Sequence, residues 1–152
     1  MEKHMKIFNY IDKQLVFFLD VKTKEEALQQ LVNQTFDAAQ LPDQERFHQA
    51  ILHRESIVST GIGMGVAIPH AKLASYNNFF IAIGILQTGI DWNALDGAPV
   101  RLLFLIGGPD DKPTEYLKML SNLTHLLRDE ELRKQLITAT SGLEVVRLFE
   151  VL

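Results

Sequence analysis

The pattern of apolar and polar residues divides the start of the chain into a short apolar run and a helix. Residues 15–19 form the apolar run. Thr23 then stands three residues before Glu26, which is the spacing of a capping box and predicts the start of a helix. Between residues 27 and 39 apolar side chains recur at steps of three and four, so this helix has one apolar face over roughly four turns.

A second helix and a glycine-rich segment follow. Pro42 predicts the start of this helix, on which one face is shared by Phe47, Ala50, Ile51 and Arg54. From residue 55 to residue 70 the helical period disappears, and the segment contains Gly61, Gly63, Gly65 and Pro69. These residue types predict backbone that turns tightly or closely approaches another group.

The middle of the chain has the composition of buried strands. Residues 79–87 and 100–106 are dense in Ile, Leu and Phe, which is typical of strands covered on both faces. The polar connection between them, residues 91–99, contains Trp92 and the turn pattern Asp96-Gly97. The first of these strands is preceded by helical patterns, and the second ends at the sequence Gly107-Gly108-Pro109.

Helical patterns resume near Pro113, where one face is marked by Leu117, Leu120, Leu123, Thr124 and Leu127. Two shorter helical patterns cover residues 129–137 and 141–152. Helices before and after a central group of apolar strands predict an α/β fold, in which helices cover one sheet. A chain of 152 residues has the usual size of one compact domain, so we expect residues 1–152 to form a single domain.

Composition and charge exclude several classes of protein. The chain is 47% hydrophobic and 22% charged, which is typical of a globular protein and not of a disordered one. Its formal net charge is −4 and its Lys and Arg residues are not clustered, so we expect no direct binding of nucleic acid. The sequence contains no cysteine, which excludes disulfides and cysteine chemistry.

The N-terminal sequence does not have the pattern of a targeting segment. Charged residues are scattered through positions 1–20, so the apolar stretch of a signal peptide is missing. The longest apolar runs are far shorter than the ~20 residues that a membrane helix needs. We therefore expect a cytoplasmic protein without membrane insertion.

The segment from Arg54 to residue 71 has the residue types of an anion site. Its glycines let backbone N–H groups approach a ligand, and the hydroxyls of Ser59 and Thr60 can donate hydrogen bonds. Arg54 offers a guanidinium group that matches phosphate oxygens. His70 adds an imidazole whose ordinary pKa of ~6.5 leaves a neutral, nucleophilic nitrogen at cytoplasmic pH, so reversible phosphoryl transfer needs no cofactor.

Structural explanations of the same residues remain open at this point. A glycine-rich turn is often only a turn, and a single histidine after a proline is often structural. The glycines also lack the Gly-x-Gly-x-x-Gly spacing of a dinucleotide site, and the chain has no Gly-Lys-Ser/Thr sequence. The residues alone therefore leave a phosphoryl site and a structural loop as alternatives.

The segment from Ser59-Thr60-Gly61-Ile62-Gly63 to Ala67-Ile68-Pro69-His70 resembles the active-site motif of the type-2 IIA domains of the bacterial phosphotransferase system. This is the mannitol/fructose class, which includes the nitrogen-regulatory IIA proteins. Further similar segments are Arg54-Glu55, Gly89-Ile90-Asp91-Trp92, Asp96-Gly97, Pro99-Val100 and Tyr116-Leu117-Lys118-Met119-Leu120-Ser121. The resemblance covers roughly residues 10–150.

The resemblance implies a single domain with a mixed central sheet flanked by helices, a fold of the phosphotransferase IIA type. His70 matches the phosphorylated histidine, which would receive its phosphate from the phosphohistidine of HPr or of its nitrogen-branch counterpart. Arg54 matches the arginine beside that histidine and would pair with the phosphoryl group. Ser59 and Thr60, with Gly61 and Gly63, would bind phosphate or shape the loop.

One position departs from the family pattern. Many members have a second histidine at the start of the helix after the Pro-containing loop, where this chain has Tyr116. A phenol can form hydrogen bonds but stays neutral at pH 7. A transfer role borrowed from the second histidine therefore does not apply here, and Tyr116 is expected to influence the pKa of His70 or the lifetime of its phosphorylated state.

The remaining histidines do not indicate a metal site. For His4, His48 and His53 we expect surface or capping roles, and no pair has the spacing of a zinc motif. Without metal ligands, a metal-dependent hydrolase has no support in the sequence.

The function predicted from the sequence is therefore a phosphoryl carrier that uses His70 and Arg54. Its phosphate would pass to a IIB partner and an imported sugar, or its phosphorylation state would regulate target proteins. Because no IIB or membrane segment adjoins the domain in this chain, regulation of the nitrogen type is favoured. The alternative is a regulatory module of the same fold that binds proteins without being phosphorylated, and the oligomeric state is left open.

Overall fold

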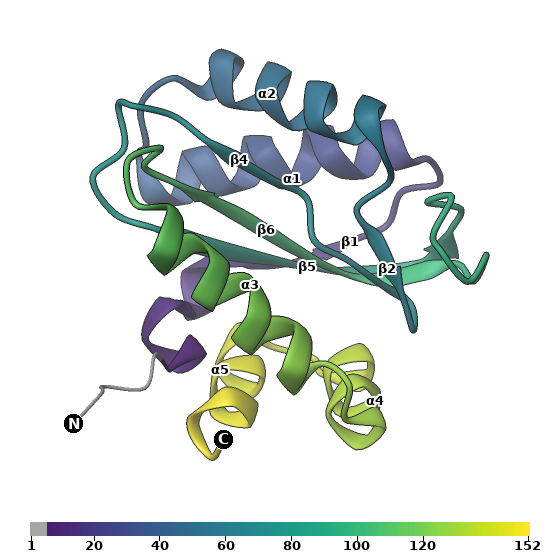
Figure 1. Ribbon diagram of the computed structural model, residues 1–152. Helices are drawn as coiled ribbons and strands as arrows, with labels where there is room; N and C mark the ends of the chain where they lie inside the picture. Colours follow the sequence, from purple (N-terminus) through teal and green to yellow (C-terminus); the bar gives the residue numbers. More distant parts are fainter. Residues whose placement is uncertain (1–5) are drawn as a thin grey trace.

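The computed structural model describes residues 6–152 as one mixed β-sheet with helices on both of its faces (Figure 1). The helices α1 (Lys24–Ala39) and α2 (Gln44–Ile57) lie on one face. On the other face lie α3 (Pro113–Leu126), α4 (Glu130–Thr138) and α5 (Gly142–Glu150), together with two short 3-10 helices, η1 (Ile7–Tyr10) and η2 (Lys13–Leu15). This arrangement confirms the predicted α/β fold with a mixed sheet between helices.

The sheet is built around two long antiparallel strands. Its strands are β1 (Val16–Leu19), β2 (Gly61–Gly63), β3 (Val66–Ala67), β4 (His70–Lys72), β5 (Phe80–Ile90) and β6 (Val100–Gly108). Their order is β1-β5-β6-β3-β2, and β4 pairs with β6 beyond the end of β3. Strand β1 is parallel to β5, while β3 and β4 are both parallel to β6. The free edge of β6 is thus shared by two short strands, and β4 carries His70.

Alternation along the strands produces one core on each side of the sheet. On β6, Phe104 and its neighbours at even positions pack with α3, α4 and α5, whereas Leu103 and Leu105 pack with α1 and α2. Both sets are buried, which explains why the strand sequences are apolar without a polar alternate position. The helices therefore need only one apolar face each, as their sequence patterns predict.

The helix start predicted at Thr23 is present, and Thr23 is the N-cap of α1. The Thr23 hydroxyl accepts a hydrogen bond from the Glu26 N–H at 3.1 Å and also contacts the Glu26 carboxylate. The second helix starts at Gln44 and not at Pro42, because Asp43 has a positive φ of 64° and interrupts the helical backbone. It also continues to Ile57, past the point where the sequence pattern loses its period, so Arg54 lies in its last turn.

The glycine-rich segment turns tightly, as predicted, since Gly63 and Gly65 have positive φ angles, and it also forms the three short strands β2, β3 and β4. One expectation for α3 needs correction. On α3 the face toward the sheet is formed by Tyr116, Met119 and Leu123, whereas the side chain of Leu117 is 64% exposed. Leu117 is displaced by about 100° from Tyr116 around the helix, which turns it toward solvent.

No helix within residues 6–152 combines the length and the apolar composition that crossing a membrane requires.

Candidate phosphoryl-transfer site

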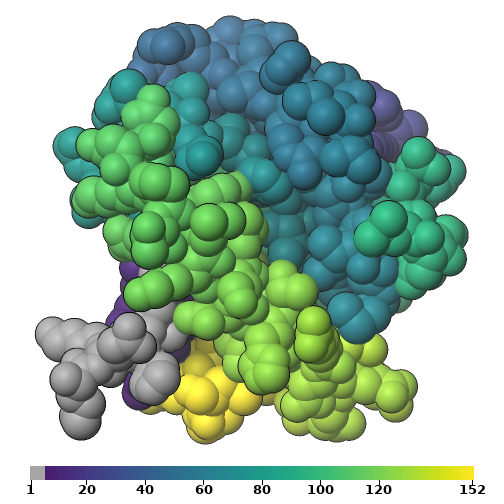
Figure 2. Space-filling model, in the orientation of Figure 1, coloured from purple at the N-terminus to yellow at the C-terminus, as the bar shows by residue number. Residues whose placement is uncertain are grey.

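His70 lies where the two helical layers meet at the edge of the sheet. It begins β4, pairs with Ile106 of β6 and is only partly buried. Because β4 is an edge strand, side chains from α2 on one face and α3 on the other can both reach the imidazole. In Figure 2 the teal atoms of the chain around this strand are visible at the surface between blue α2 and green α3.

Both nitrogens of the His70 ring have defined neighbours. Nδ1 lies 2.8 Å from the carbonyl oxygen of Ile68, which can only accept a hydrogen bond, so Nδ1 carries the proton. In the neutral ring Nε2 then has a free lone pair. Arg54 donates its Nε–H to this nitrogen at 3.3 Å, and its Nη1 donates to the carbonyl of Val58 at 2.8 Å. The structure thus brings together the two residues predicted to perform the chemistry.

The surroundings of His70 favour its neutral form. Burial lowers the pKa of the imidazole below its usual value of 6.5, and the positive charges of Arg54 and Lys72 lower it further. The hydrogen bond to Ile68 and the negative charge of Glu55 act in the opposite direction. The net effect is a lowered pKa, which favours the neutral imidazole over the cation at neutral pH.

Tyr116 is placed beside His70, as the sequence comparison predicts. The two rings are tilted with centroids 5.6 Å apart, and Phe79 stacks on Tyr116 at 6.1 Å. Lys72 places its ammonium group 4.7 Å from the centroid of the phenol ring. Burial raises the pKa of Tyr116 above its usual value of 10, so the phenol remains a hydrogen-bond donor. Within the described chain, its hydroxyl is the only buried side-chain polar atom without a hydrogen-bond partner.

The hydroxyls of the motif are engaged in contacts within the protein. Ser59 donates to the carbonyl of Trp92 at 2.6 Å and accepts from the N–H of Gly61 at 3.1 Å. Thr60 donates its hydroxyl to Glu55. Through its carbonyl, Thr60 also accepts the N–H of Ile68 at 3.0 Å, and Ile68 in turn holds His70. These contacts place both residues in the framework of the loop.

Two glycines of the motif lie where a side chain would clash or where φ is positive. A Cβ atom at Gly61 would lie 2.8 Å from the Cβ of Ala94, so this position tolerates no side chain without movement of the connection between β5 and β6. Gly63 has a φ of 95°, and the Asp96 carboxylate packs against it while accepting the Met64 N–H at 2.9 Å. Both glycines therefore fix the loop against the connection that contains Trp92.

A buried carboxylate in this site, Glu55, was given no role by the sequence analysis. Its side chain is 6% exposed and forms an ion pair with Lys24 at 2.8 Å. It also accepts hydrogen bonds from the Thr60 N–H at 3.1 Å, from the Thr60 hydroxyl and from the Trp92 indole at 3.3 Å. The only sequence signal was its position next to Arg54, in a segment shared with the family.

The other histidines lie apart from these groups. His48 is buried on α2, contrary to the surface or capping role expected of it, because it lies on the flank of the helix that packing covers. His53 is exposed on α2, and His4 lies outside the described residues. Within residues 6–152 no group of three or more His, Asp and Glu side chains is arranged to hold a metal ion.

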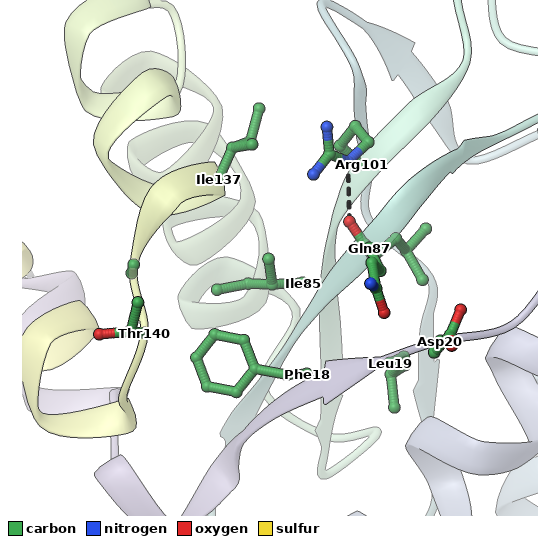
Figure 3. A pocket seen from close by; sticks show the side chains of 10 residues that line it. Phe18, Leu19, Asp20, Ile85, Gln87, Arg101, Ile137 and Thr140 are labelled. Atoms are coloured by element: carbon green, nitrogen blue, oxygen red, sulfur yellow. Dashed lines mark hydrogen bonds between the residues drawn. The ribbon is translucent and has the colours of Figure 1, made fainter.

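A cavity of about 490 Å³ lies away from His70, near the opposite end of β6 (Figure 3). Its walls include Phe18, Ile137 and Arg101, whose Nε donates to the carbonyl of Leu86 at 2.7 Å. His70 pairs with Ile106, several residues further along β6, so the cavity is not part of the histidine site. The site at His70 is instead open to the surface, which suits a reaction with another protein.

The molecule is an α/β protein with a surface histidine site. Its mixed sheet lies between helical layers, and a partly exposed histidine lies at the edge of that sheet. Residues 9–151 match the family described as "Phosphoenolpyruvate-dependent sugar phosphotransferase system, EIIA 2", and the chain belongs to this family.

The chain is similar to relatives named as sugar-specific components of the phosphotransferase system and to relatives named as nitrogen regulatory proteins. The fructose-specific EIIABC component of the phosphotransferase system of Bacillus subtilis is 42% identical over 138 residues, which cover 90% of this chain and 22% of that protein. The chain thus spans about a fifth of that relative. A nitrogen regulatory protein of Bradyrhizobium diazoefficiens is 38% identical over 120 residues, which cover 78% of this chain and 76% of that protein.

A solved structure has the same fold. The crystal structure of nitrogen regulatory protein IIA-Ntr from Neisseria meningitidis superimposes with a TM-score of 0.86 at 25% identity, covering 94% of this chain and 98% of that one.

Proposed function

We propose that the protein is a phosphoryl carrier whose His70 accepts a phosphoryl group from the phosphohistidine of HPr, or of its nitrogen-branch counterpart, and passes it on. The observation that carries this proposal is the state of the imidazole. Its Nδ1 is held by the Ile68 carbonyl, and its Nε2 has a free lone pair facing Arg54 at an accessible edge of the sheet. Membership of the EIIA 2 family supports the same chemistry.

In the proposed reaction, the Nε2 lone pair of His70 forms a bond to phosphorus. The bond from phosphorus to the donor's imidazole breaks, and its electron pair returns to the donor nitrogen. His70 keeps its Nδ1 proton against Ile68, so the phosphorylated ring carries a positive charge. That charge makes the ring a good leaving group, and the phosphoryl group can therefore be transferred again. No cofactor or metal takes part in these steps.

Arg54 and Tyr116 are the groups that we assign to the phosphoryl oxygens. When Nε2 is phosphorylated it can no longer accept the Arg54 hydrogen bond, so the guanidinium is free to pair with the new oxygens. The unpartnered Tyr116 hydroxyl is the second donor, since it lies on the ring packed against His70. Their charge and dipoles would stabilise the charge that is spread over the transferring group.

The remaining residues of the motif have a supporting role in this proposal. Ser59, Thr60, Gly61 and Gly63 shape the loop that holds His70, because their hydroxyls and backbones already contact the protein. We further propose that residues 1–152 act as one domain, in the cytoplasm, without direct contact to nucleic acid.

The test is phosphorylation by purified phospho-HPr, resolved by mass spectrometry under conditions that preserve phosphohistidine. We expect the wild-type protein to gain one acid-labile phosphoryl group and the His70→Ala variant to gain none. His53→Ala, which removes an exposed histidine of α2, is the matched control and should retain the gain. A wild-type protein that is never phosphorylated would instead identify a binding module of the same fold.

For the output of the phosphate we propose regulation of target proteins of the nitrogen type. The TM-score of 0.86 with the IIA-Ntr structure supports this assignment. Transfer to a IIB partner and then to a sugar is the second candidate, favoured by the 42% identity to a fructose-specific EIIABC component.

Incubating the phosphorylated protein with a fructose-type IIB domain separates these outputs. Rapid loss of phosphate to IIB would establish the sugar pathway, whereas a stable phosphoprotein would favour regulation. The position of the gene provides an independent test, since a neighbouring sugar permease indicates transport and a neighbouring nitrogen-type sigma factor indicates regulation.

A further inference from the structure

Glu55 joins four separate segments of the protein through one carboxylate. Lys24 from the start of α1 pairs with Oε2 at 2.8 Å, and the N–H of Thr60 donates to the same oxygen at 3.1 Å. The Thr60 hydroxyl and the Trp92 indole, 3.3 Å away, donate to Oε1. All of these groups are donors to the carboxylate, and each lies far from Glu55 in sequence or across the turn that follows α2.

A buried carboxylate needs such partners because leaving water is costly for a charge. Trp92 is fully buried, and its ring also lies 5.2 Å below the Lys24 ammonium, which completes the enclosure. A residue that only ends a helix does not need these contacts. Together they fix the position of the Glu55 carboxylate relative to Lys24, Thr60 and Trp92.

Two routes connect Glu55 to His70. Along the first, Glu55 and Arg54 are adjacent in the last turn of α2, so anchoring Glu55 fixes the rotation of that turn and the direction of the Arg54 side chain. Along the second, Glu55 holds Thr60, whose carbonyl accepts the Ile68 N–H at 3.0 Å. Ile68 then holds Nδ1 of His70 at 2.8 Å. One carboxylate thereby fixes the neighbours of both ring nitrogens.

We propose that Glu55, ion-paired with Lys24, is a positioning residue for phosphoryl transfer, which holds Arg54 and Ile68 in register with Nε2 and Nδ1 of His70. This inference rests on the proposed carrier function and adds a residue to its machinery. Glu55 does not touch the phosphoryl group, since its oxygens are enclosed by Lys24, Thr60 and Trp92.

The charge of Glu55 acts on the titration of His70, which provides a readout besides the transfer rate. The charged groups acting on His70 are Arg54 and Lys72, which lower the pKa of the imidazole, and Glu55, which raises it. Neutralising Glu55 must therefore lower the pKa of His70 further. Neutralising Arg54 must raise it, so the two substitutions have opposite signs.

Two variants separate the effect of the charge of Glu55 from the effect of its side-chain length. Glu55→Gln keeps the length of the side chain and removes the charge, while Glu55→Asp keeps the charge and shortens the side chain by one methylene. We expect both to lower the transfer rate at saturating phospho-HPr by ~10- to 100-fold, because small displacements of reacting groups have effects of this size. The KM for phospho-HPr should stay unchanged, since the carboxylate is buried.

The titration of His70, followed by NMR of its ring protons, distinguishes the variants further. It should shift to lower pH in Glu55→Gln and stay near the wild-type position in Glu55→Asp. Glu45→Gln is the matched control, since Glu45 is exposed in the first turn of the same helix and accepts a hydrogen bond from Gln49. Circular dichroism checks the fold of each variant. If Glu55→Gln fails to fold, the transfer rate of Glu55→Asp tests the inference.

Wild-type transfer rates in Glu55→Gln and Glu55→Asp would overturn the inference, even if His70 is phosphorylated as proposed. Failure of the proposed function has a different result, because the wild-type protein and the Glu45→Gln control would then also remain unphosphorylated. In that case the positioning role would be rejected together with the carrier function.

Discussion

In the proposed carrier, His70 must be reactive before transfer and must release its phosphoryl group afterwards. The structure meets both demands with the two ring nitrogens in different surroundings. The Ile68 carbonyl fixes the Nδ1 proton, and the Arg54 guanidinium faces Nε2. Burial and the nearby cations lower the pKa of the ring, which keeps the lone pair available. The arginine that depresses this pKa is the group that would bind the phosphate once it arrives.

Replacing Arg54 by Gln is expected to slow phosphorylation severely while leaving the fold intact. The variant removes a donor from the phosphoryl group, and single donors of this kind are worth about 10²- to 10³-fold in rate. Because the positive charge of Arg54 lowers the pKa of His70, that pKa should rise in the variant. Quenched phosphorylation assays and an NMR titration of His70 measure the two effects. An unchanged rate would remove Arg54 from the site.

Replacing Tyr116 by Phe is expected to stabilise the fold and to slow phosphoryl transfer. Tyr116→Phe removes a buried hydroxyl that has no hydrogen-bond partner, so the free energy of unfolding should rise by about 1 kcal/mol. If this hydroxyl donates to the phosphoryl group, the same change should slow transfer by roughly 10-fold or more, the value of a hydrogen bond to a charged group. Denaturant unfolding and phosphorylation rates test both signs.

Tyr116→His provides the complementary test, because it restores the residue type that many family members have at this position. An imidazole beside His70 can titrate, whereas the phenol stays neutral. We expect a change in the rate of transfer or in the lifetime of the phosphoprotein. Unchanged values in both the Phe and the His variant would contradict a role for Tyr116 in transfer.

At the scale of elements, the sequence predicts what depends on local patterns. The capping box of Thr23, the apolar face of α1 and the two long strands could be read directly, because each is a periodic or capping signal within one segment. The strands β2, β3 and β4 could not be read, because each has only two or three residues and exists through pairing with another part of the sheet. β3 and β4 are strands because they pair with β6, and β2 is a strand because it pairs with β3.

The same distinction applies to the site. Arg54 and His70 could be predicted because they lie in a recognisable motif. The role of Glu55 could not, because its partners Lys24 and Trp92 come from positions about 30 to 40 residues away on either side. The burial of His48 was missed for a related reason, since the packing of α2 on the sheet sets which flank of the helix is covered.

The helix start of α4 offers a test of element stability apart from the site. Asp129 accepts hydrogen bonds from the N–H groups of Glu131 at 2.9 Å and Leu132 at 3.4 Å. Asp129→Ala should lower the free energy of unfolding by about 1 kcal/mol, the usual cost of losing an N-cap. Phosphorylation by phospho-HPr should be unaffected. Asp110→Ala, in an exposed loop, is the control and should change neither quantity.

At the scale of the whole molecule, the fold places a reactive group where two independent cores meet. The helices on opposite faces of the sheet bury separate apolar clusters, and at the edge strand β4 side chains from both layers reach one residue. His70 receives Arg54 from one layer and Tyr116 from the other, yet remains partly exposed. A carrier that docks with other proteins needs its reactive group at such a partly exposed position, because most side chains of the two long strands are buried under helices.

This position connects the stability of the whole protein to pH through His70. The pKa of the imidazole is lower in the folded protein than its ordinary 6.5, so between these two values the unfolded chain binds more protons than the folded one. The contribution of His70 to stability is therefore full above pH ~6.5 and is lost as the pH falls through the window below that value. Urea unfolding of wild type and His70→Ala at several values between pH 5 and 7.5 should show that the variant lacks this part of the pH dependence. Parallel curves for the two proteins would mean that the folded environment does not favour the neutral imidazole, and the nucleophile proposed for transfer would lose its physical basis.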